Sequence, residues 1–198
     1  HLFQDSPLLR GDELDDEAAS GDDAGMLRDS GFAAMVDATP MGLGRRPEAL
    51  ARVSAAADLH IVATTGRHRE AHYPAGHWTH SLDVAALTKA FVEDVERGLP
   101  RNDAERGGAG AGSGSTLALD PNGLAVQAGL IKAGIDYWSI STFERRTLDA
   151  VAAAHHATAR PIMVHLEFCT AAHEVLDLLV SEGVSADRIV LAHADRDP

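Results

Sequence analysis

The chain has 198 residues, of which 45% are hydrophobic and 24% are charged, a composition typical of a globular protein with one sizeable core. Its formal net charge of −13 argues against nucleic acid and anionic membranes as partners, and no apolar run reaches the ~20 residues that span a bilayer. The single cysteine, Cys169, rules out an internal disulfide and favours a reducing compartment, so we expect a cytoplasmic protein. Because the chain opens at His1 without a methionine, we expect its natural start to lie upstream.

The first half of the chain alternates between strand and helix patterns. In order, the spacing of apolar residues predicts the end of a strand at 1–3, an exposed acidic loop at 12–23, the end of a helix at 26–30, a buried strand at 32–38, a helix at 47–57 and a strand at 59–65. A loop at 67–80 then carries four of the eleven histidines. Ser81 is expected to cap a helix that ends at Gly98.

The second half follows a glycine-rich loop at 101–116 and is more regular. A strand opens the stretch AGLIKAGIDYWS at 128–139, and Ser141 with Glu144 forms the capping-box pattern of a helix that runs to about 158. A strand at 161–166, a helix capped by Thr170 and ended by Gly183, and a strand at 188–192 complete the pattern. This alternation without hairpin signals predicts a parallel α/β fold.

Lys132, inside the apolar stretch at 128–139, is the most informative single residue. An unpaired ammonium in apolar surroundings is costly, so a buried lysine usually shifts its pKa or takes part in special chemistry. Only Lys89 and Lys132 are lysines among the 17 basic residues. We therefore expect Lys132 to serve through its amine. The alternative is a lysine that reaches solvent from the end of a strand.

Two histidines occupy matching positions on the next predicted strands. His165 follows Lys132 by 33 residues and His193 follows His165 by 28, each close to one strand–helix–strand unit of ~30 residues. Parallel α/β proteins place their functional sites at the carboxyl ends of the strands. Since side chains alternate along a strand, the three groups are expected to point to one centre.

A lysine and two histidines that converge in this way suggest a metal site. A protonated lysine is a poor ligand because an ammonium has no free lone pair. After reaction with carbon dioxide, however, Lys132 would carry an anionic carbamate whose two oxygens can bridge two divalent cations. Zinc is the first candidate, and manganese, iron and cobalt stay open because mixed nitrogen and oxygen ligation does not choose among them.

Four motifs occur in a specific order: HLFQD at the start, GLIKAG around Lys132, PIMVHLE around His165 and VLAHADR around His193. With them the chain resembles the phosphotriesterase family of the amidohydrolase superfamily over nearly all of its length. The resemblance implies a (β/α)8 TIM barrel of the metal-dependent hydrolase type with a two-metal centre. It further implies His1 as a first-strand metal ligand, Lys132 as the catalytic bridging carbamate, and His165 and His193 as ligands of the second metal.

The resemblance also implies Asp195 and Arg196 as a pair that supports the metal ligands. The family's other first-strand histidine would lie two residues before His1, and its eighth-strand aspartate would lie beyond the 198 residues. A complete barrel takes ~250 residues, so we interpret residues 1–198 as one incomplete barrel domain with roughly the first six strands.

His68 is a candidate substrate-binding residue. It stands two residues after Gly66, where lactone-hydrolysing relatives have a tyrosine and some phosphotriester-hydrolysing relatives a tryptophan. The resemblance therefore carries no substrate preference over to this chain. The alternative for His68 is a histidine exposed on a loop.

We predict a metal-dependent hydrolase in which a hydroxide shared by two metals attacks an ester, a lactone or a phosphoester. Its partner is a small-molecule substrate, and a homodimer is left open. One alternative is a truncated, non-catalytic paralogue of the same fold, which the missing ligands favour. The other is a dinucleotide-dependent oxidoreductase, because GLGRRP at 42–47 follows a predicted strand and resembles a glycine-rich phosphate loop.

Overall fold

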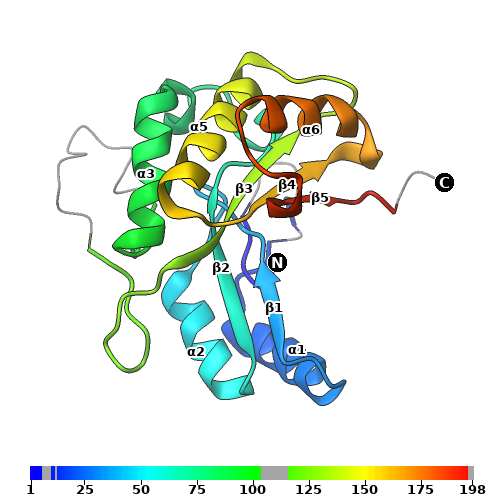
Figure 1. Cartoon of the computed structure of the whole chain (residues 1–198). Coiled ribbons are helices and arrows are strands. Elements are labelled where there is room, and N and C mark those ends of the chain that lie inside the picture. The colour runs from blue at the N-terminus through cyan, green and yellow to red at the C-terminus, as the bar shows by residue number, and fades with distance from the viewer. Residues whose placement is uncertain (6–9, 12, 104–115, 196–198) are drawn as a thin grey trace.

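The computed structural model describes residues 1–5, 10–11, 13–103 and 116–195. Five parallel strands form one sheet in which spatial order equals chain order (Figure 1). They are β1 (Ala34–Asp37), β2 (His60–Gly66), β3 (Ala128–Ile135), β4 (Ile162–Leu166) and β5 (Ile189–Ala192). Each strand pairs in parallel with the next. The sheet forms a half-barrel, which confirms the predicted class as part of a TIM barrel.

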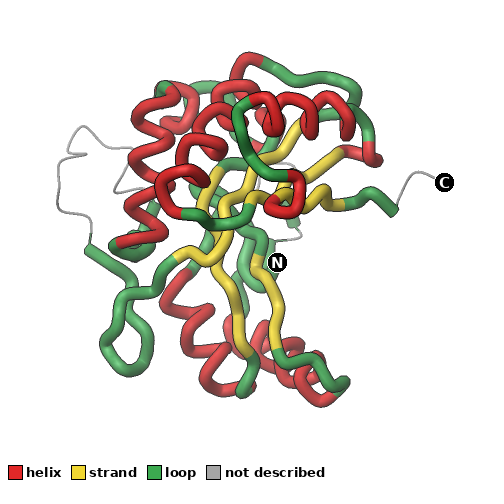
Figure 2. Tube along the Cα trace, in the orientation of Figure 1, coloured by secondary structure: helices red, strands yellow, loops and turns green. Residues whose placement is uncertain are grey.

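One helix precedes β1 and the others connect consecutive strands, and they lie on the outside of the sheet, as Figure 2 shows. They are α1 (Glu17–Asp29), α2 (Pro47–Ala57), α3 (Val84–Glu96), α5 (Thr142–Thr158) and α6 (Ala172–Ser181). Short 3-10 helices lie at η2 (Glu70–His72), η3 (Trp78–Ser81), η4 (Glu167–Cys169) and η5 (Ala186–Arg188). Within the described ranges, no helix is long and apolar enough to cross a membrane.

Helix α5 starts where the capping-box pattern predicts. The Ser141 hydroxyl accepts a hydrogen bond from the Glu144 N–H at 3.3 Å, and the Glu144 carboxylate accepts one from the Ser141 N–H at 2.8 Å. The apolar face that follows packs on β3 and β4 and joins a core cluster that includes Ile131, Leu148 and Val164. The carboxyl end of β3 is therefore anchored by a helix with a fixed start.

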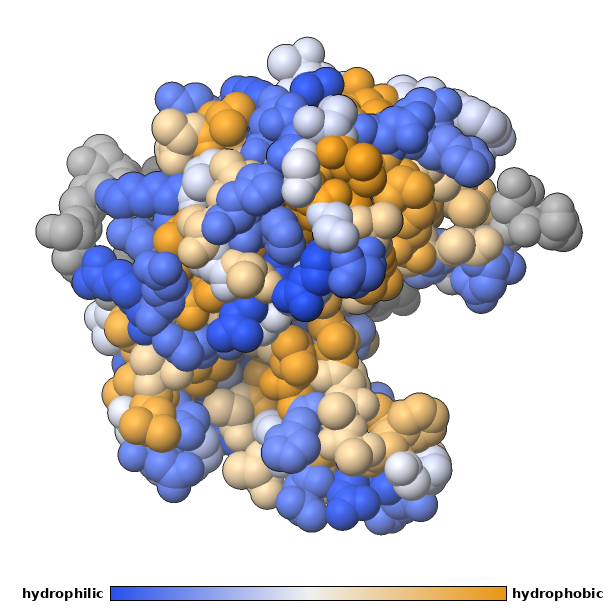
Figure 3. Space-filling model, viewed as in Figure 1, coloured by the Kyte–Doolittle hydropathy of each residue, from blue (hydrophilic) through white to orange (hydrophobic). Residues whose placement is uncertain are grey.

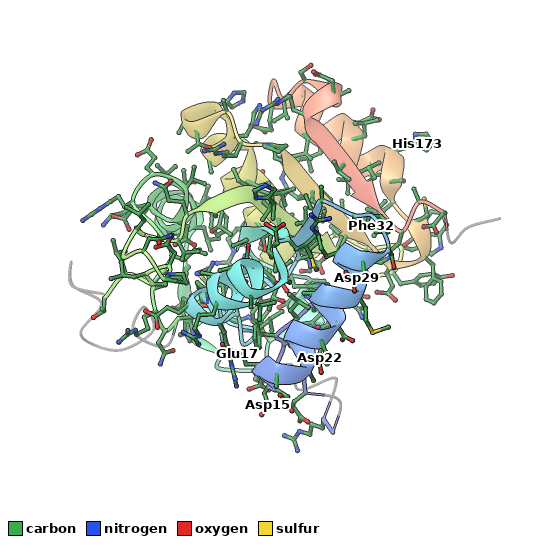
Figure 4. All side chains as sticks on the ribbon, turned by 90° about the horizontal axis from the view of Figure 1, so that it is seen from below. Asp15, Glu17, Asp22, Asp29, Phe32 and His173 are labelled. Carbon is green, nitrogen blue, oxygen red and sulfur yellow. The ribbon has the colours of Figure 1, made fainter. Side chains whose placement is uncertain are left out.

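The predicted acidic loop at 12–23 is wrong, because α1 already begins at Glu17. The Asp16 side chain accepts hydrogen bonds from the N–H groups of Ala18 and Ala19, and Glu17 adds negative charge to the first turn. Both features stabilise a helix N-terminus. Figure 4 shows Glu17, Asp22 and Asp29 along this helix and Asp15 just before it, seen from below. Its weak apolar stripe explains why hydrophobic spacing does not reveal it.

Two predicted caps and one predicted strand also differ from the structure. Asp83, not Ser81, caps α3 by accepting from the Ala86 N–H at 2.8 Å. Thr170 does not cap α6, since its hydroxyl donates instead to the Glu167 carbonyl at 2.6 Å. Residues 1–3 do not pair as a strand and are held partly by the Asp37 carboxylate, which accepts from the Leu2 N–H at 2.6 Å. Most of the predicted loop at 101–116 lies outside the described residues.

The half-barrel leaves a notch between the part of the molecule that carries α1 and the part that carries β5 (Figure 3). Hydrophobic side chains show along it, and β5 itself contains Val190 with 48% of its surface exposed. The edges of β1 and β5 have no further strand partner among the described residues.

Candidate functional site

Lys132 lies in the second half of β3 and has 2% of its surface exposed. Its Nζ donates a hydrogen bond to the Ala38 carbonyl at 2.7 Å, so the alternative of a lysine that reaches solvent is wrong. Burial lowers the pKa of Lys132 to about 8, and the nearby Asp37 carboxylate opposes this change. At pH 7 such a lysine would hold a free amine in roughly one molecule in ten, against about one in three thousand at its usual pKa.

His165 and His193 lie on the two strands that follow β3 in the sheet. His165 sits opposite Gly134 of β3 and Ala192 of β5, two residues beyond the level of Lys132. His193 follows β5 directly with φ of 66°, a left-handed conformation that is uncommon for a residue other than glycine. The two imidazole rings lie 4.7 Å apart between centroids. The predicted arrangement on adjacent strands at one edge of the sheet is therefore present.

His1 approaches the same edge from the N-terminal segment. Its Nδ1 lies 2.7 Å from the Thr39 hydroxyl, one residue beyond the carbonyl that accepts from Lys132. Figure 1 shows the N-terminus beside the tip of β1. His1 and Lys132 therefore both contact the segment that follows β1.

His68 is buried, with 4% of its surface exposed, so the alternative of a loop histidine in solvent is wrong. Its ring centroid lies 4.5 Å from that of His165 and 4.0 Å from that of His72. Burial, and then the charge of Lys132, hold the pKa of His68 well below its usual value. The His68 Nδ1 accepts a hydrogen bond from the Arg69 N–H at 2.8 Å, so the proton of the neutral ring lies on Nε2.

Gly134 provides the room for this loop. A Cβ atom at Gly134 would lie 2.9 Å from the Arg69 backbone nitrogen and 3.0 Å from the His68 Nδ1. On the other side of His68, the fully buried Arg67 fixes the loop by donating to the carbonyls of Thr79 and Phe143.

Sequence reasoning missed His72, Arg69 and Glu167. Burial is the main cause that lowers the pKa of His72 to about 4. The His165 Nε2 donates to the Glu167 Oε2 at 3.2 Å, and the Arg69 guanidinium approaches the same oxygen at 3.2 Å. The signals available were the histidine-rich loop at 67–80 and a glutamate two residues after His165 in PIMVHLE.

The imidazole of His165 is suited to metal binding because it is neutral near pH 7. Burial is the main cause that lowers the pKa of His165, while the Glu167 carboxylate acts in the opposite direction. A neutral imidazole offers a lone pair, which a metal ligand requires. Among the described residues, no group of three His, Cys, Asp or Glu side chains could hold a metal ion. The candidate donors are therefore the buried Lys132 and imidazoles such as that of His165. This set fits a metal pair only if Lys132 becomes a carbamate, whose oxygens can bind metal.

The predicted supporting pair is only partly described. Asp195 is exposed in the turn after β5, and Arg196 lies outside the described residues. Their role therefore stays a prediction.

The GLGRRP turn is occupied by contacts within the chain. The Gly42 N–H donates to the Asp103 carboxylate at 2.9 Å, and the Arg45 guanidinium contacts the carboxylates of Asp103 and Asp94 at 2.6 and 3.0 Å. Carboxylates therefore take the donors that a dinucleotide phosphate would need. This observation removes the support for the oxidoreductase alternative.

A cavity of about 430 Å³ opens beside His72. Its lining combines the N-terminal segment with the loops after β1 and β2, namely Asp5, Arg10, Glu13, Gly42, His72, Pro74 and His77.

Five parallel strands in chain order, joined by helices, define the chain as part of a (β/α)8 barrel. The sequence model of the "Phosphotriesterase family" matches residues 1–111 and 119–198. The chain belongs to this family.

Three proteins illustrate the similarity. A phosphotriesterase homology protein of Mycobacterium tuberculosis is 30% identical over 202 residues, which cover 97% of this chain and 54% of that protein. The crystal structure of a lactonase from Listeria monocytogenes superposes with a TM-score of 0.79 at 25% identity, over 99% of this chain and 59% of that one. The structure of the organophosphorus hydrolase of Deinococcus radiodurans superposes with a TM-score of 0.77 at 25% identity, over 100% of this chain and 56% of that one. The chain thus spans about half the length of the curated relatives it matches.

Proposed function

We propose that this chain is part of a two-metal hydrolase that acts on an ester, a lactone or a phosphoester, and that it supplies four of the metal ligands. The observation that carries the proposal is that buried Lys132 and His165 lie two residues apart in register on neighbouring strands, with the His193 ring 4.7 Å from that of His165. Its relatives include a lactonase and an organophosphorus hydrolase, which supports this range of substrates.

His1, His165, His193 and a carbamate on Lys132 would hold two divalent cations, zinc in the first place. When bound, the cations would activate water near neutral pH and polarise the bond under attack. Lys132 would form the carbamate when its amine lone pair attacks the carbon of carbon dioxide, forming an N–C bond and releasing a proton. The lowered pKa of Lys132 favours this step because it raises the fraction of free amine.

His68 would contact the substrate. Its Nδ1 already accepts from the Arg69 N–H, so its Nε2–H is the group left to donate to an oxygen of a bound ester or phosphoester. Because burial keeps the ring neutral, this donor is present throughout the neutral pH range.

The experiment is metal analysis of the complete protein, followed by hydrolysis assays with a lactone, an aryl ester and a phosphotriester. We expect about two cations per chain and hydrolysis of at least one substrate, lost with a chelator and restored with added zinc or manganese. In the variant Lys132→Arg we expect the bound cations to be lost. Lys89→Arg, at the exposed lysine of α3, is its control.

A second candidate is the non-catalytic paralogue. The observation that favours it is that, among the described residues, no three His, Cys, Asp or Glu side chains lie together as metal ligands. A folded complete protein without bound metal would support this candidate and contradict the hydrolase.

A further inference from the structure

We propose that Glu167, held by Arg69, is a positioning residue that fixes the ring orientation and the tautomer of His165. The inference rests on the proposed function, in which His165 is a metal ligand. Glu167 lies in η4, two residues beyond His165, and its Oε2 accepts from the His165 Nε2 at 3.2 Å.

Arg69 contacts the same oxygen of the Glu167 carboxylate. Its Nη2 lies 3.2 Å from the Glu167 Oε2, and its Nη1 contacts the Asp136 Oδ1 at 2.8 Å. Arg69 therefore links the loops after β2, β3 and β4. Side chains of both Arg69 and Glu167 are mostly buried, with 18% and 23% of their surfaces exposed, so solvent screens this pair less than an exposed one.

The backbone around Glu167 is fixed as well. Phe168 and Cys169 adopt left-handed conformations, with φ of 52° and 59°, which turn the chain sharply after β4. The Thr170 hydroxyl donates to the Glu167 carbonyl at 2.6 Å and accepts from the Trp138 N–H at 3.0 Å. Left-handed non-glycine residues persist only where their surroundings determine them, and they cluster at functional sites.

The contact decides which nitrogen of His165 can bind a metal. A carboxylate only accepts hydrogen bonds, so the Nε2 that faces Glu167 must carry the proton. In the neutral ring this leaves the lone pair on Nδ1, which becomes the metal-binding atom. A carboxylate on the far nitrogen of a metal-binding histidine fixes the ring and raises its basicity.

The test compares Glu167→Ala and Glu167→Gln in the complete protein with Glu174→Ala, an exposed glutamate on α6, as the matched control. The first readout is the tautomer of His165 in the metal-free protein, from its ring ¹⁵N chemical shifts. We expect an Nε2–H ring in the wild type and in Glu174→Ala, and a mixture of tautomers in Glu167→Ala.

The second readout is zinc affinity, measured by competition with a chromogenic chelator. We expect Glu167→Ala to weaken it about 10- to 100-fold, and Glu167→Gln, whose amide oxygen can still accept, to weaken it less. A wild-type ring protonated on Nδ1 would overturn the inference, as would unchanged tautomer and affinity in a folded Glu167→Ala. An Nε2–H ring in a wild-type protein that binds no zinc would overturn the proposed function and leave the positioning of His165 by Glu167 in place.

Discussion

Lys132→Met in the complete protein, free of metal and carbon dioxide, tests whether the lysine is buried as an amine of low pKa. The unfolded lysine has a pKa of 10.5 and the folded one about 8. The difference corresponds to about 3 kcal/mol of lost folding stability at any pH below 8. Methionine has nearly the same length and no charge, so it removes this loss.

The sign of the pH dependence follows from proton binding. Between pH 8 and 10.5 the unfolded chain holds a proton on Lys132 that the folded chain has released. Raising the pH through this window therefore stabilises the folded wild type relative to Lys132→Met, by up to about 3 kcal/mol. The hydrogen bond from Nζ to Ala38 changes the absolute stability of the variant, but the change with pH reports the titration alone.

The assay is urea unfolding of both proteins at pH 7, 8, 9 and 10, with Lys89→Met as the control. Lys89 on α3 has 76% of its side chain exposed, and its variant should keep a constant offset from the wild type. If the difference in free energy of unfolding between the wild type and Lys132→Met is also constant from pH 7 to 10, the reasoning is refuted.

Three further predictions concern the metal site and the stability of the fold. Lys132→Arg should abolish binding of the metal pair although it keeps the charge, because a guanidinium neither forms a carbamate nor bridges two metals. Metal analysis checks this, and two bound metals in the Lys132→Arg variant would contradict it. Gly134→Ala should destabilise the fold by about 1–3 kcal/mol, because the new Cβ would press on the Arg69 backbone, whereas Gly21→Ala in α1, with open space around it, should not; urea unfolding of both variants decides. The polypeptide of residues 1–198 alone should aggregate or pack loosely, because the edges of β1 and β5 lack strand partners in the described sheet; a sharp thermal transition of a monomer would count against this.

Much of the frame can be predicted because its signals are local. Helix α2 spans Pro47–Ala57 as the proline and the apolar spacing indicate, and the capping box of Ser141 and Glu144 starts α5 where expected. The strand–helix spacing also places Lys132 and His165 on neighbouring strands.

The rest depends on interactions between distant segments. The contact of Arg69 with Asp136 and Glu167 joins three loops whose relative positions are set by strand register, which no local pattern encodes. The sharp turn at Phe168 has no glycine from which the sequence could predict it. Helix α1 follows from the Asp16 cap and its acidic first turn, signals that an apolar-spacing argument ignores.

The burial that makes Lys132 unusual depends on a glycine in the adjacent strand. Gly66 pairs with Lys132 and has φ of 103°, and a Cβ atom there would lie only 1.9 Å from the Lys132 carbonyl oxygen. Because Gly66 lacks a side chain, the chain after β2 can turn back against β3, where the Arg67 N–H donates to the same carbonyl at 3.0 Å. The turn brings His68 into contact with His165 and helps to keep water from the lysine. The close backbone approach at Gly66 therefore supports both the position of His68 and the low pKa of Lys132, so the chemistry proposed for this site is a consequence of how β2 and β3 pack.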